Sequence, residues 1–376
     1  MHVTRLDIRR LRRFDEVSLS PGAGINLVTG DNGAGKTSVL EALHLMAYGR
    51  SFRGRVRDGL VQTGAPALEL FVEWQEQRRP GVRKAGLRHT GQDWSGRLDG
   101  EPVAHLGDLC AALAVVSFEP GSHALVTGSG DGRRRYLDWG LFHVEPGFLA
   151  LWRRYARALK QRNALLKGRS GEAQLDAWDR ELADAGEPLG SHRQRYLEAL
   201  QPHFAALTAE WVPALGATAL EYLPGWRREE LPLADALLLA RERDLATGFT
   251  SVGPHRADWR ISFANLAGRE SLSRGQAKLV ALSALMAQAE HYAVSRAEWP
   301  IISLDDLASE LDRPHQARVL DWLRRSGAQV FVTGTEAPST LESLAGMRTF
   351  HVEHGMVVAC ADEPPPAGAG SLPDRG

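Results

Sequence analysis

The chain has 376 residues, of which 43% are hydrophobic and 24% are charged, and this length allows one large α/β core with a second lobe, or two to three domains. The formal net charge is −1, so the chain lacks the overall basic excess typical of nucleic-acid-binding proteins. Any contact with DNA therefore has to come from local basic patches.

Residues 2–29 are expected to form three short strands, the first two joined by a basic turn. The turn precedes Phe14, after which Val17 and Leu19 alternate with polar residues. Its arginines are Arg9, Arg10, Arg12 and Arg13. Two interpretations of this group stay open, a solvated edge or a contact with DNA phosphates.

A strand, a glycine-rich loop and a helix are predicted over residues 25–45. Ile25 to Val28 is an apolar run, and the apolar residues from Val39 to Met46 have helical spacing. The loop between them reads G-x-x-x-x-G-K-T, in which bare glycines let backbone N–H groups wrap a phosphate chain at a helix start. The predicted nucleotide-binding residues are Gly30, Asp31, Asn32, Gly33, Ala34, Gly35, Lys36, Thr37 and Ser38.

Two side chains of this loop have distinct expected roles. Lys36 supplies a point charge that reaches the β- and γ-phosphates of ATP and acts in catalysis, and the Thr37 hydroxyl ligates Mg²⁺. The alternative is a glycine-rich turn that ends in Lys-Thr by coincidence. The match at every fixed position, in a strand and helix context, argues against that alternative.

A second basic cluster and an antiparallel layer are predicted next. The cluster follows Gly49 and contains Arg53 and Arg55. Short strands over residues 68–74 and 94–98, separated by glycines and charged turns, predict an antiparallel layer attached to the nucleotide site.

A mainly helical lobe is expected over residues 121–248. Gly, Ser and Thr dominate residues 121–132, which indicates a domain crossing. The apolar spacing that follows is helical without sustained heptads. Few acidic residues accompany the bases of the first long helix, which favours DNA contact over a merely solvated face. The basic candidates here are Arg134, Arg135, Arg153, Arg154, Arg157 and Lys160.

Residues 249–361 are expected to return to α/β character and to complete the domain begun by residues 1–120, and residues 362–376 are expected to form a disordered tail. A strand over residues 300–304 ends in two carboxylates. Asp305 is the expected second anchor for Mg²⁺, with a helix cap as its alternative role. Asp306 is expected to orient the attacking water.

The long helix that starts after Leu272 offers a second anion site. Ser273 supplies a hydroxyl, Gly275 a bare amide and Gln276 a further polar group, all at the positive end of the helix. We call a set of groups that surrounds a phosphate a cradle. One γ-phosphate does not need two complete cradles from one compact subunit. The sequence therefore predicts a dimer in which the second cradle of each subunit closes on the ATP of the other.

The two cysteines, Cys110 and Cys360, are too few and too far apart for a disulfide framework or a cysteine-based zinc site. No stretch approaches about 18 uninterrupted apolar residues, and the opening residues show no charged-then-apolar leader. We therefore expect a cytoplasmic protein without membrane contact.

The order of P-loop, Ser-x-Gly-Gln and strand-Asp-Asp resembles the ABC-type ATPase heads of SMC and Rad50 proteins, and more closely the RecF family. The resemblance covers the chain from Met1 to about Ala361. It rests on Gly-Asp-Asn-Gly-Ala-Gly-Lys-Thr at 30–37, Ser-Phe-Arg at 51–53, Arg-Arg-Tyr-Leu-Asp-Trp at 134–139, Lys-Gln-Arg-Asn at 160–163, Gly-Pro-His-Arg at 253–256, Leu-Ser-Arg-Gly-Gln at 272–276, Leu-Asp-Asp at 304–306 and Ser-Glu-Leu-Asp at 309–312.

This resemblance implies an α/β ABC-type P-loop head, with a mixed sheet, helices and an antiparallel β layer. An inserted helical lobe replaces the long coiled coil of SMC proteins. It also implies an ATP-dependent homodimer that binds DNA at gaps and at double-strand to single-strand junctions. The implied partners are RecR and, with RecO, RecA, which is delivered to single-stranded DNA.

The sequence departs from the RecF pattern near residues 118–121 and at Gly130, where a Pro is common, and it differs from other ABC ATPases at two positions that fit RecF-like proteins. Pro120 precedes Gly121 where the family usually has Pro-Glu, so no sensor of the γ-phosphate is named there. Val332-Thr-Gly-Thr335 offers no histidine after the last core strand, and Asp306 replaces the Glu of transporter ATPases. The last two features suggest a slow, DNA-stimulated ATPase in which hydrolysis times the release of DNA.

Two other classes remain as alternatives. The nucleotide-binding subunit of an ABC transporter would share the P-loop, but the arginine-rich insert and the absent histidine argue against it. A P-loop kinase or other metabolic phosphotransferase would leave the segment from Ser273 to Gln276 without a role.

Overall fold

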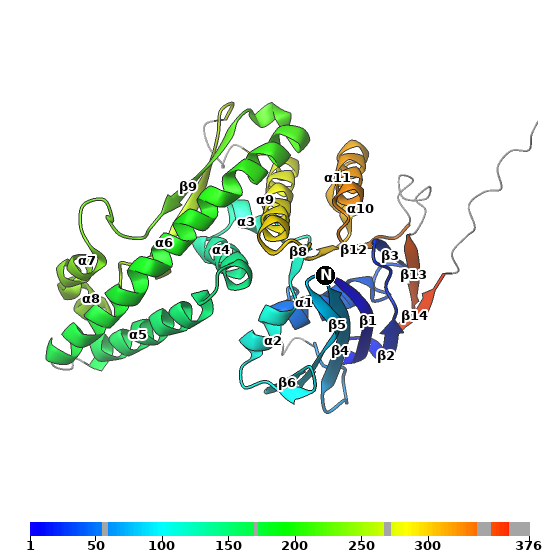
Figure 1. Ribbon diagram of the computed structural model, residues 1–376, viewed down its shortest axis with the longest axis horizontal. Helices are drawn as coiled ribbons and strands as arrows, with labels where there is room; N and C mark the ends of the chain where they lie inside the picture. The colour runs from blue at the N-terminus through cyan, green and yellow to red at the C-terminus, as the bar shows by residue number, and fades with distance from the viewer. Residues whose placement is uncertain (55–58, 169–171, 267–271, 337–346, 361–376) are drawn as a thin grey trace, which may run out of the picture. The chain divides into compact units, whose positions relative to one another are not determined.

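The structure is a computed structural model that describes residues 1–54, 59–168, 172–266, 272–336 and 347–360 (Figure 1). The chain divides into two compact units, Met1–Glu119 with Pro300–Gly376, and Pro120–Trp299. The predicted tail at 362–376 and the DNA candidate Arg55 lie outside the described residues. Among the described residues, no helix has both the length and the apolar character needed to cross a bilayer.

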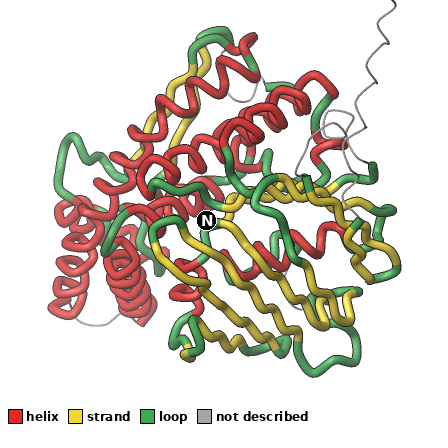
Figure 2. The backbone as a smooth tube through the Cα atoms, turned by 45° about the vertical axis from the view of Figure 1, so that its right-hand side comes forward, coloured by secondary structure: helices red, strands yellow, loops and turns green. Residues whose placement is uncertain are grey.

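The first unit contains an antiparallel sheet with the strand order β2-β1-β4-β5-β6-β7, whose strands run side by side in Figure 2. Side chains alternate between a buried and an exposed face along β1, β2 and β4, as expected when one face of a sheet packs on a core. The strands are β1 (His2–Leu11), β2 (Phe14–Leu19), β4 (Leu68–Glu76), β5 (Arg79–His89), β6 (Trp94–Leu98) and β7 (Glu101–Pro102).

The second sheet of this unit has the order β14-β13-β3-β12-β11-β8 and is parallel except for β14. Its central strands β11 and β12 are buried at every position, which explains their continuous apolar sequences. The strands are β3 (Ile25–Thr29), β8 (Val115–Phe118), β11 (Ile301–Leu304), β12 (Val330–Thr333), β13 (Arg348–Glu353) and β14 (Met356–Ala359).

The helix α1 (Lys36–Tyr48) contacts β1 of the antiparallel sheet and both β8 and β12 of the parallel sheet. Because neighbours surround it, almost all of its side chains are buried, and its polar positions are few. The other helices of the first unit are α2 (Leu106–Ala112), α10 (Leu307–Glu310) and α11 (Arg313–Ser326).

The second unit is mainly helical. Its longest element is the 40-residue helix α6, which packs against α5 and α9. The helices are α3 (Ala124–Thr127), α4 (Gly130–Val144), α5 (Phe148–Gly168), α6 (Glu172–Trp211), α7 (Leu233–Leu239), α8 (Arg241–Thr247) and α9 (Arg274–Arg296), with 3₁₀ turns at Pro213–Leu215 and Pro254–Arg256. Two strands, β9 (Thr218–Leu223) and β10 (Asp258–Phe263), form an antiparallel pair.

This division differs from the expected domain boundaries in one respect. Residues 249–299 were assigned with the ATPase head by their α/β character, but they belong to the helical unit. The physical reason is that β10 pairs with β9 along its whole length, and α9 packs on α6. Only the segment from Pro300 onward returns to the first unit.

A buried ion network connects α5, α6 and α8 within the second unit. The fully buried Arg162 donates from Nε to Asp179 Oδ1 at 2.5 Å and from an Nη to Asp244 Oδ2 at 2.7 Å. The same guanidinium donates to Thr250 Oγ1 at 3.0 Å, and Asn163 accepts from the Thr250 amide at 2.8 Å. The Lys-Gln-Arg-Asn block at 160–163 thus contributes two residues to a structural core.

The Gly-Pro-His-Arg block at 253–256 also takes part in buried hydrogen bonds within the second unit. Tyr155 Oη lies 2.7 Å from His255 Nδ1, while His255 Nε2 lies 2.9 Å from the Thr250 carbonyl oxygen. Burial lowers the pKa of His255 to about 4, so the ring is neutral and Nε2 carries the proton that it donates to Thr250. Arg193 donates to the Pro254 carbonyl at 2.7 Å and pairs with the buried Asp138 at 2.8 Å.

We expect Asp244→Ala to lower the free energy of unfolding by about 3–5 kcal/mol, because it leaves part of a buried guanidinium without its partner. The matched control Glu181→Ala removes the partner of exposed Arg154 and should cost less than about 1 kcal/mol. Urea unfolding followed by tryptophan fluorescence measures both. Equal destabilisation by the two variants would contradict a structural role for the network.

Candidate nucleotide site

The phosphate-binding loop of the predicted nucleotide site is constrained by its glycines. Gly30 has φ of 143°, and a Cβ there would lie 2.2 Å from the Val352 carbonyl oxygen. Gly35 has φ of 125°, and a Cβ there would lie 3.0 Å from the Phe14 ring. Both positions therefore require glycine for conformation and for space. No side chain of the described chain caps the start of α1, which leaves its first amides for an anion.

Lys36 is buried and folds back over the loop. Its Nζ donates to the carbonyl oxygens of Gly30 at 2.6 Å and Asp31 at 2.9 Å. The ammonium group is thus held directly above the loop whose amides face a phosphate. A phosphate oxygen would replace these carbonyl contacts with a stronger charge-assisted bond.

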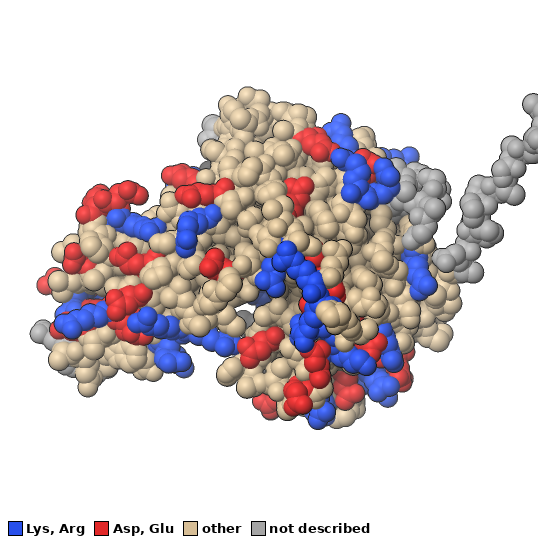
Figure 3. Space-filling view, in the orientation of Figure 1, with Lys and Arg blue, Asp and Glu red and all other residues tan. Residues whose placement is uncertain are grey.

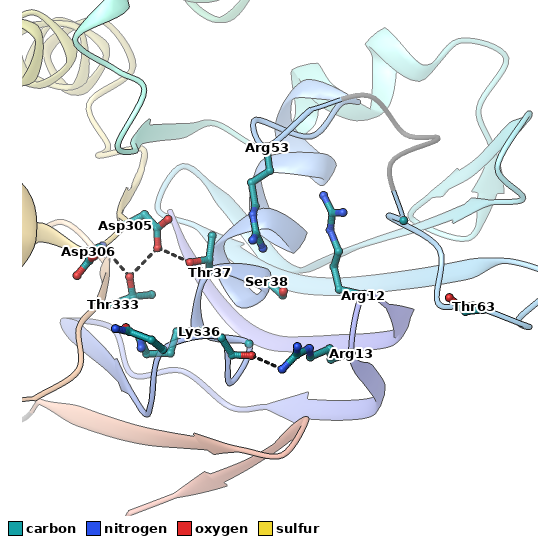
Figure 4. A pocket seen from close by; sticks show the side chains of 14 residues that line it. Arg12, Arg13, Lys36, Thr37, Ser38, Arg53, Thr63, Asp305, Asp306 and Thr333 are labelled. Atoms are coloured by element: carbon teal, nitrogen blue, oxygen red, sulfur yellow. Dashed lines mark hydrogen bonds between the residues drawn. The ribbon is translucent and has the colours of Figure 1, made fainter.

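The predicted metal ligands lie together. Thr37 Oγ1 donates to Asp305 Oδ1 at 3.0 Å, although 268 positions separate the two residues in the chain (Figure 4). They meet because β3 and β11 flank β12 in one parallel sheet, so the segments that follow them emerge at the same edge. Oxygen ligands of this kind suit Mg²⁺, which takes one or two protein oxygens and keeps several waters.

Thr333, at the end of β12, is a further residue of the site that the sequence did not reveal. Its hydroxyl donates to Asp305 Oδ1 at 2.7 Å and accepts from the Asp306 amide at 2.8 Å. Burial raises the pKa of Asp305, and the hydroxyls of Thr333 and Thr37 oppose that rise because they favour the carboxylate. One threonine thus holds the carboxylate of Asp305 and the backbone amide of Asp306.

Asp306 has a backbone conformation that suits a special role. Its φ of 52° and ψ of 44° are left-handed, which is uncommon for a residue with a side chain. Its Oδ2 accepts from Ser309 Oγ at 2.6 Å. Asp306 stands at the cap position of α10, whereas the Asp305 carboxylate is turned to Thr37 and Thr333, so the alternative role of Asp305 as a helix cap is wrong.

These residues surround a cavity of about 400 Å³ within the first unit. Three arginines predicted to contact DNA line this cavity, namely Arg12, Arg13 and Arg53 (Figure 4). Arg12 pairs with the buried Glu41 at 2.8 Å, and Arg13 donates to the Gly33 carbonyl at 2.8 Å. The β1–β2 hairpin brings them there, since Leu11 pairs with Phe14, whose ring packs on Gly35.

Glu119 is a second residue of this region that sequence analysis missed. It follows β8, whose last residue Phe118 pairs with Leu304 of β11. Burial and the neighbouring Asp305 raise the pKa of Glu119 to about 7, while Arg50 opposes that rise. Only the order of strands in the sheet places Glu119 beside Asp305, and no residue pattern in the sequence carries that order.

The residues predicted to form a second cradle lie at the start of α9, in the second unit. Ser273 Oγ accepts from the Gln276 amide at 3.2 Å, and Gln276 Oε1 accepts from the Ser273 amide at 2.9 Å. This capping box leaves the proton of the Ser273 hydroxyl available to another acceptor. Gly275 is exposed, and a Cβ there would meet no atom of the described residues within 4 Å, so these residues leave the approach to the helix start open.

The remaining basic candidates have varied surroundings within the second unit. Arg134 donates to the Ala257 carbonyl at 2.7 Å, Arg135 pairs with Asp131 at 2.5 Å and Arg154 pairs with Glu181 at 2.7 Å. Arg153 is half-buried on α5. Arg157 and Lys160 are exposed on α5 and form no ion pair or hydrogen bond with other side chains in the described part of the chain.

We expect Thr333→Val to weaken binding of ATP in the presence of Mg²⁺ by about tenfold, because a buried carboxylate loses a hydrogen bond worth about 1–3 kcal/mol. Thr333→Ser keeps the hydroxyl and should bind like the unchanged chain. Fluorescence titration with a labelled ATP analogue, in Mg²⁺ and in EDTA, measures the effect. An equal loss in EDTA would show that Thr333 does not act through the metal ligands.

Comparison with known proteins agrees with this geometry. Residues 2–358 match the family described as RecF/RecN/SMC N terminal domain. The DNA replication and repair protein RecF of Stenotrophomonas maltophilia (strain R551-3) is 69% identical over 362 residues, which cover 96% of this chain and 100% of that protein. The RecF of Thioalkalivibrio sulfidiphilus (strain HL-EbGR7) is 40% identical over 94% of this chain and 98% of that protein.

Solved structures give the same result. The structure of the recombination mediator protein RecF with ATP, in the RecFOR pathway, superposes with a TM-score of 0.86 at 26% identity, covering 96% of this chain and 98% of that chain. An Smc head bound to a domain of ScpA superposes with a TM-score of 0.59 at 15% identity over 96% of this chain and 98% of that chain, which supports the fold alone. The predicted ABC-type ATPase head, of the kind found in SMC proteins, is confirmed. The chain belongs to the RecF family of DNA replication and repair proteins.

Proposed function

We propose that this chain is an ATP-dependent DNA-binding protein of recombinational repair and replication restart. On ATP it forms a homodimer at DNA gaps or at double-strand to single-strand junctions, and with RecR and RecO it helps to load RecA on single-stranded DNA. The observation that carries the proposal is the convergence of Lys36, Thr37 and Asp305 on one cavity. The relative solved with ATP supports the choice of nucleotide.

ATP binding follows from the phosphate-binding loop. The triphosphate takes the place of the loop carbonyls at Lys36 Nζ, and its oxygens accept from the uncapped amides at the start of α1. Mg²⁺, held through Thr37 and Asp305, supplies charge neutralisation for the β- and γ-phosphate oxygens. Thr333 keeps the Asp305 carboxylate turned to Thr37, so the ligands are in place before the metal arrives.

Dimerisation follows from the second cradle. Ser273, Gly275 and Gln276 of each chain meet the γ-phosphate bound by a second copy. The Ser273 hydroxyl keeps a free proton, and the start of α9 carries the partial positive charge of a helix end. Binding energy from the triphosphate then holds the two copies together, so its hydrolysis separates them.

Hydrolysis is assigned to Asp306. This residue is half-buried, lines the cavity and directly follows the metal ligand Asp305 in the chain. Its carboxylate, fixed by Ser309, orients a water for attack on the γ-phosphate. A carboxylate with a short side chain and no histidine beside it favours slow turnover, so that hydrolysis serves as a timer for release of DNA.

DNA contact is assigned first to the exposed bases of α5, Arg157 and Lys160, which form no ion pair or hydrogen bond with other side chains of the described residues. Arg134, Arg135, Arg153 and Arg154 lie on or before the same helix and contribute more weakly, since several already pair with carboxylates. On the face shown in Figure 3, Lys and Arg are interspersed with Asp and Glu. Binding of this kind falls with salt and depends little on sequence.

Light scattering tests the dimer. The unchanged chain should scatter as one chain of 41.2 kDa without nucleotide and as twice that mass with ATP and Mg²⁺. Lys36→Ala should prevent the change because ATP no longer binds, and Ser273→Ala should bind ATP yet stay monomeric. Normal dimerisation of Ser273→Ala would contradict the second cradle. A mass that ATP leaves unchanged in the unaltered chain would overturn the dimer proposal.

Hydrolysis is tested by Asp306→Asn, which keeps the size of the side chain but removes the carboxylate. We expect steady-state release of phosphate to fall by about 10²-fold or more, while the ATP-bound dimer persists. The control Ser309→Ala removes only the hydrogen bond to Asp306 and should slow turnover far less. Rapid turnover by Asp306→Asn would exclude Asp306 as the residue that orients water.

A further inference from the structure

The exposed face of the antiparallel sheet contains a hollow that the nucleotide site does not use. Its volume is about 740 Å³, within the range of small-molecule sites. It lies across β1, β4, β5, β6 and β7 of the first unit, and these strands lie side by side in Figure 2. The residues used below are Phe71, Gly86, Arg97, Asp7, Glu69 and Arg5.

The register of the sheet explains the hollow. Asp7 pairs with Phe71, Phe71 with Gly86, and Gly86 with Arg97, so these four residues form one row across four strands on the same face. Gly86 carries no side chain, and among the described residues a Cβ added there would meet only one atom within 4 Å, at 4.0 Å. The half-buried Phe71 ring is therefore open on the side of Gly86.

The ring of Phe71 is accessible to a flat group from solvent. The guanidinium carbon of Arg5 lies 5.7 Å from the centre of the ring. Arg5 is itself exposed and is paired with Asp7 at 2.8 Å. Exposed pairs of this kind contribute little to stability, so a planar ligand would displace Arg5 from the ring at small cost.

The charges around the ring are of both signs. Glu69 and Arg88 lie 3.6 Å apart and are both about half exposed, and Asp7 accepts from Ser18 at 2.7 Å as well as from Arg5. Exposed Arg97 forms no ion pair or hydrogen bond with other side chains in the described part of the chain. The hollow thus offers an aromatic floor, two carboxylates and one uncommitted guanidinium.

We propose that this hollow binds one unpaired nucleobase of single-stranded DNA. The base stacks on Phe71 over Gly86, an exocyclic amine of cytosine or adenine donates to Asp7 or Glu69, and Arg97 contacts a neighbouring phosphate. This inference deepens the proposed DNA-binding function and partly rests on it. It assigns the unpaired strand of a junction to the antiparallel sheet and not to the basic residues of α5.

The row of charges favours a base over two other occupants. A site for phosphates alone would not place Asp7 and Glu69 beside the arginines, because their charges repel a phosphate. A protein partner would be expected to bring an apolar anchor with further contacts over a larger apolar area. Amino groups on the edge of a base use the carboxylates directly, and thymine, which lacks such a group, should bind less well.

Gly86→Val tests the hollow directly, because it fills the space over Phe71 from a strand position that has room for a side chain and suits a β-branched residue. The probe is a fluorescent 12-nucleotide oligo(dC), with oligo(dT) beside it, titrated without nucleotide and followed by anisotropy. We expect oligo(dC) to bind more tightly than oligo(dT), and both Gly86→Val and Phe71→Leu to weaken oligo(dC) binding by about tenfold.

The matched control is Lys84→Ala, which removes a positive charge from the same strand but pairs with Glu73 outside the hollow. It should change oligo(dC) binding less than threefold. Urea unfolding midpoints of all variants that stay close to that of the unchanged chain confirm that the fold is intact.

A second readout locates the base. An oligo(dC) that carries one 5-iodocytosine, crosslinked by ultraviolet light, should label the peptide that contains Phe71, and Gly86→Val should abolish that label. Unaltered oligo(dC) affinity in Gly86→Val and Phe71→Leu would overturn the proposal and leave a protein partner as the occupant to test. ATP-dependent binding of blunt duplex DNA, measured in parallel, should be the same for Gly86→Val, which separates failure of this site from failure of the proposed function.

Discussion

The hydrogen bonds that meet at one oxygen, Asp305 Oδ1, are the constraint on which the nucleotide site depends. Thr37 reaches this atom from the start of α1, and Thr333 reaches it from the end of β12. Three segments remote in sequence are thereby fixed to one point at the edge of the parallel sheet. Because the carboxylate is buried, each of these bonds opposes the cost of its desolvation. The loop, the proposed metal ligands and Asp306, which is proposed to orient water, all take their positions from this edge.

The second unit is held together in a different way, because several short helices and loops pack against one long helix. It does so with buried arginines, Arg162 and Arg193, each bonded to carboxylates and to a backbone or hydroxyl oxygen of the segment 249–256. Buried ion pairs of this kind specify geometry more than they add stability. They keep the segment that leads into β10 and toward α9 in one arrangement, and α9 carries the second cradle.

Much of the nucleotide site could be predicted because its chemistry lies in short contiguous patterns. Residue type and the preceding strand are enough to recognise the loop from Gly30 to Ser38 and the pair Asp305-Asp306. Thr333 and Glu119 could not be found in this way, since their roles follow from which strands are neighbours in the sheet. The contacts of Arg12 with Glu41 and of Arg13 with Gly33 were not predicted, because a run of arginines does not reveal that a hairpin turns two of them toward the loop. Residues 249–299 were placed with the wrong unit because local α/β character does not say which partner strand β10 will choose.

The reciprocal hydrogen bonds between Ser273 and Gln276 have an entropic consequence. They fix the first turn of α9 in the isolated chain, so its amides and its hydroxyl are already oriented toward solvent. A group that has to be ordered on contact loses conformational freedom, and that loss weakens binding. At the start of α9 this loss of conformational freedom has already occurred during folding. An anion that arrives at this helix end therefore meets a rigid receptor, and the speed of its capture should be set by diffusion and charge instead of by rearrangement of the loop.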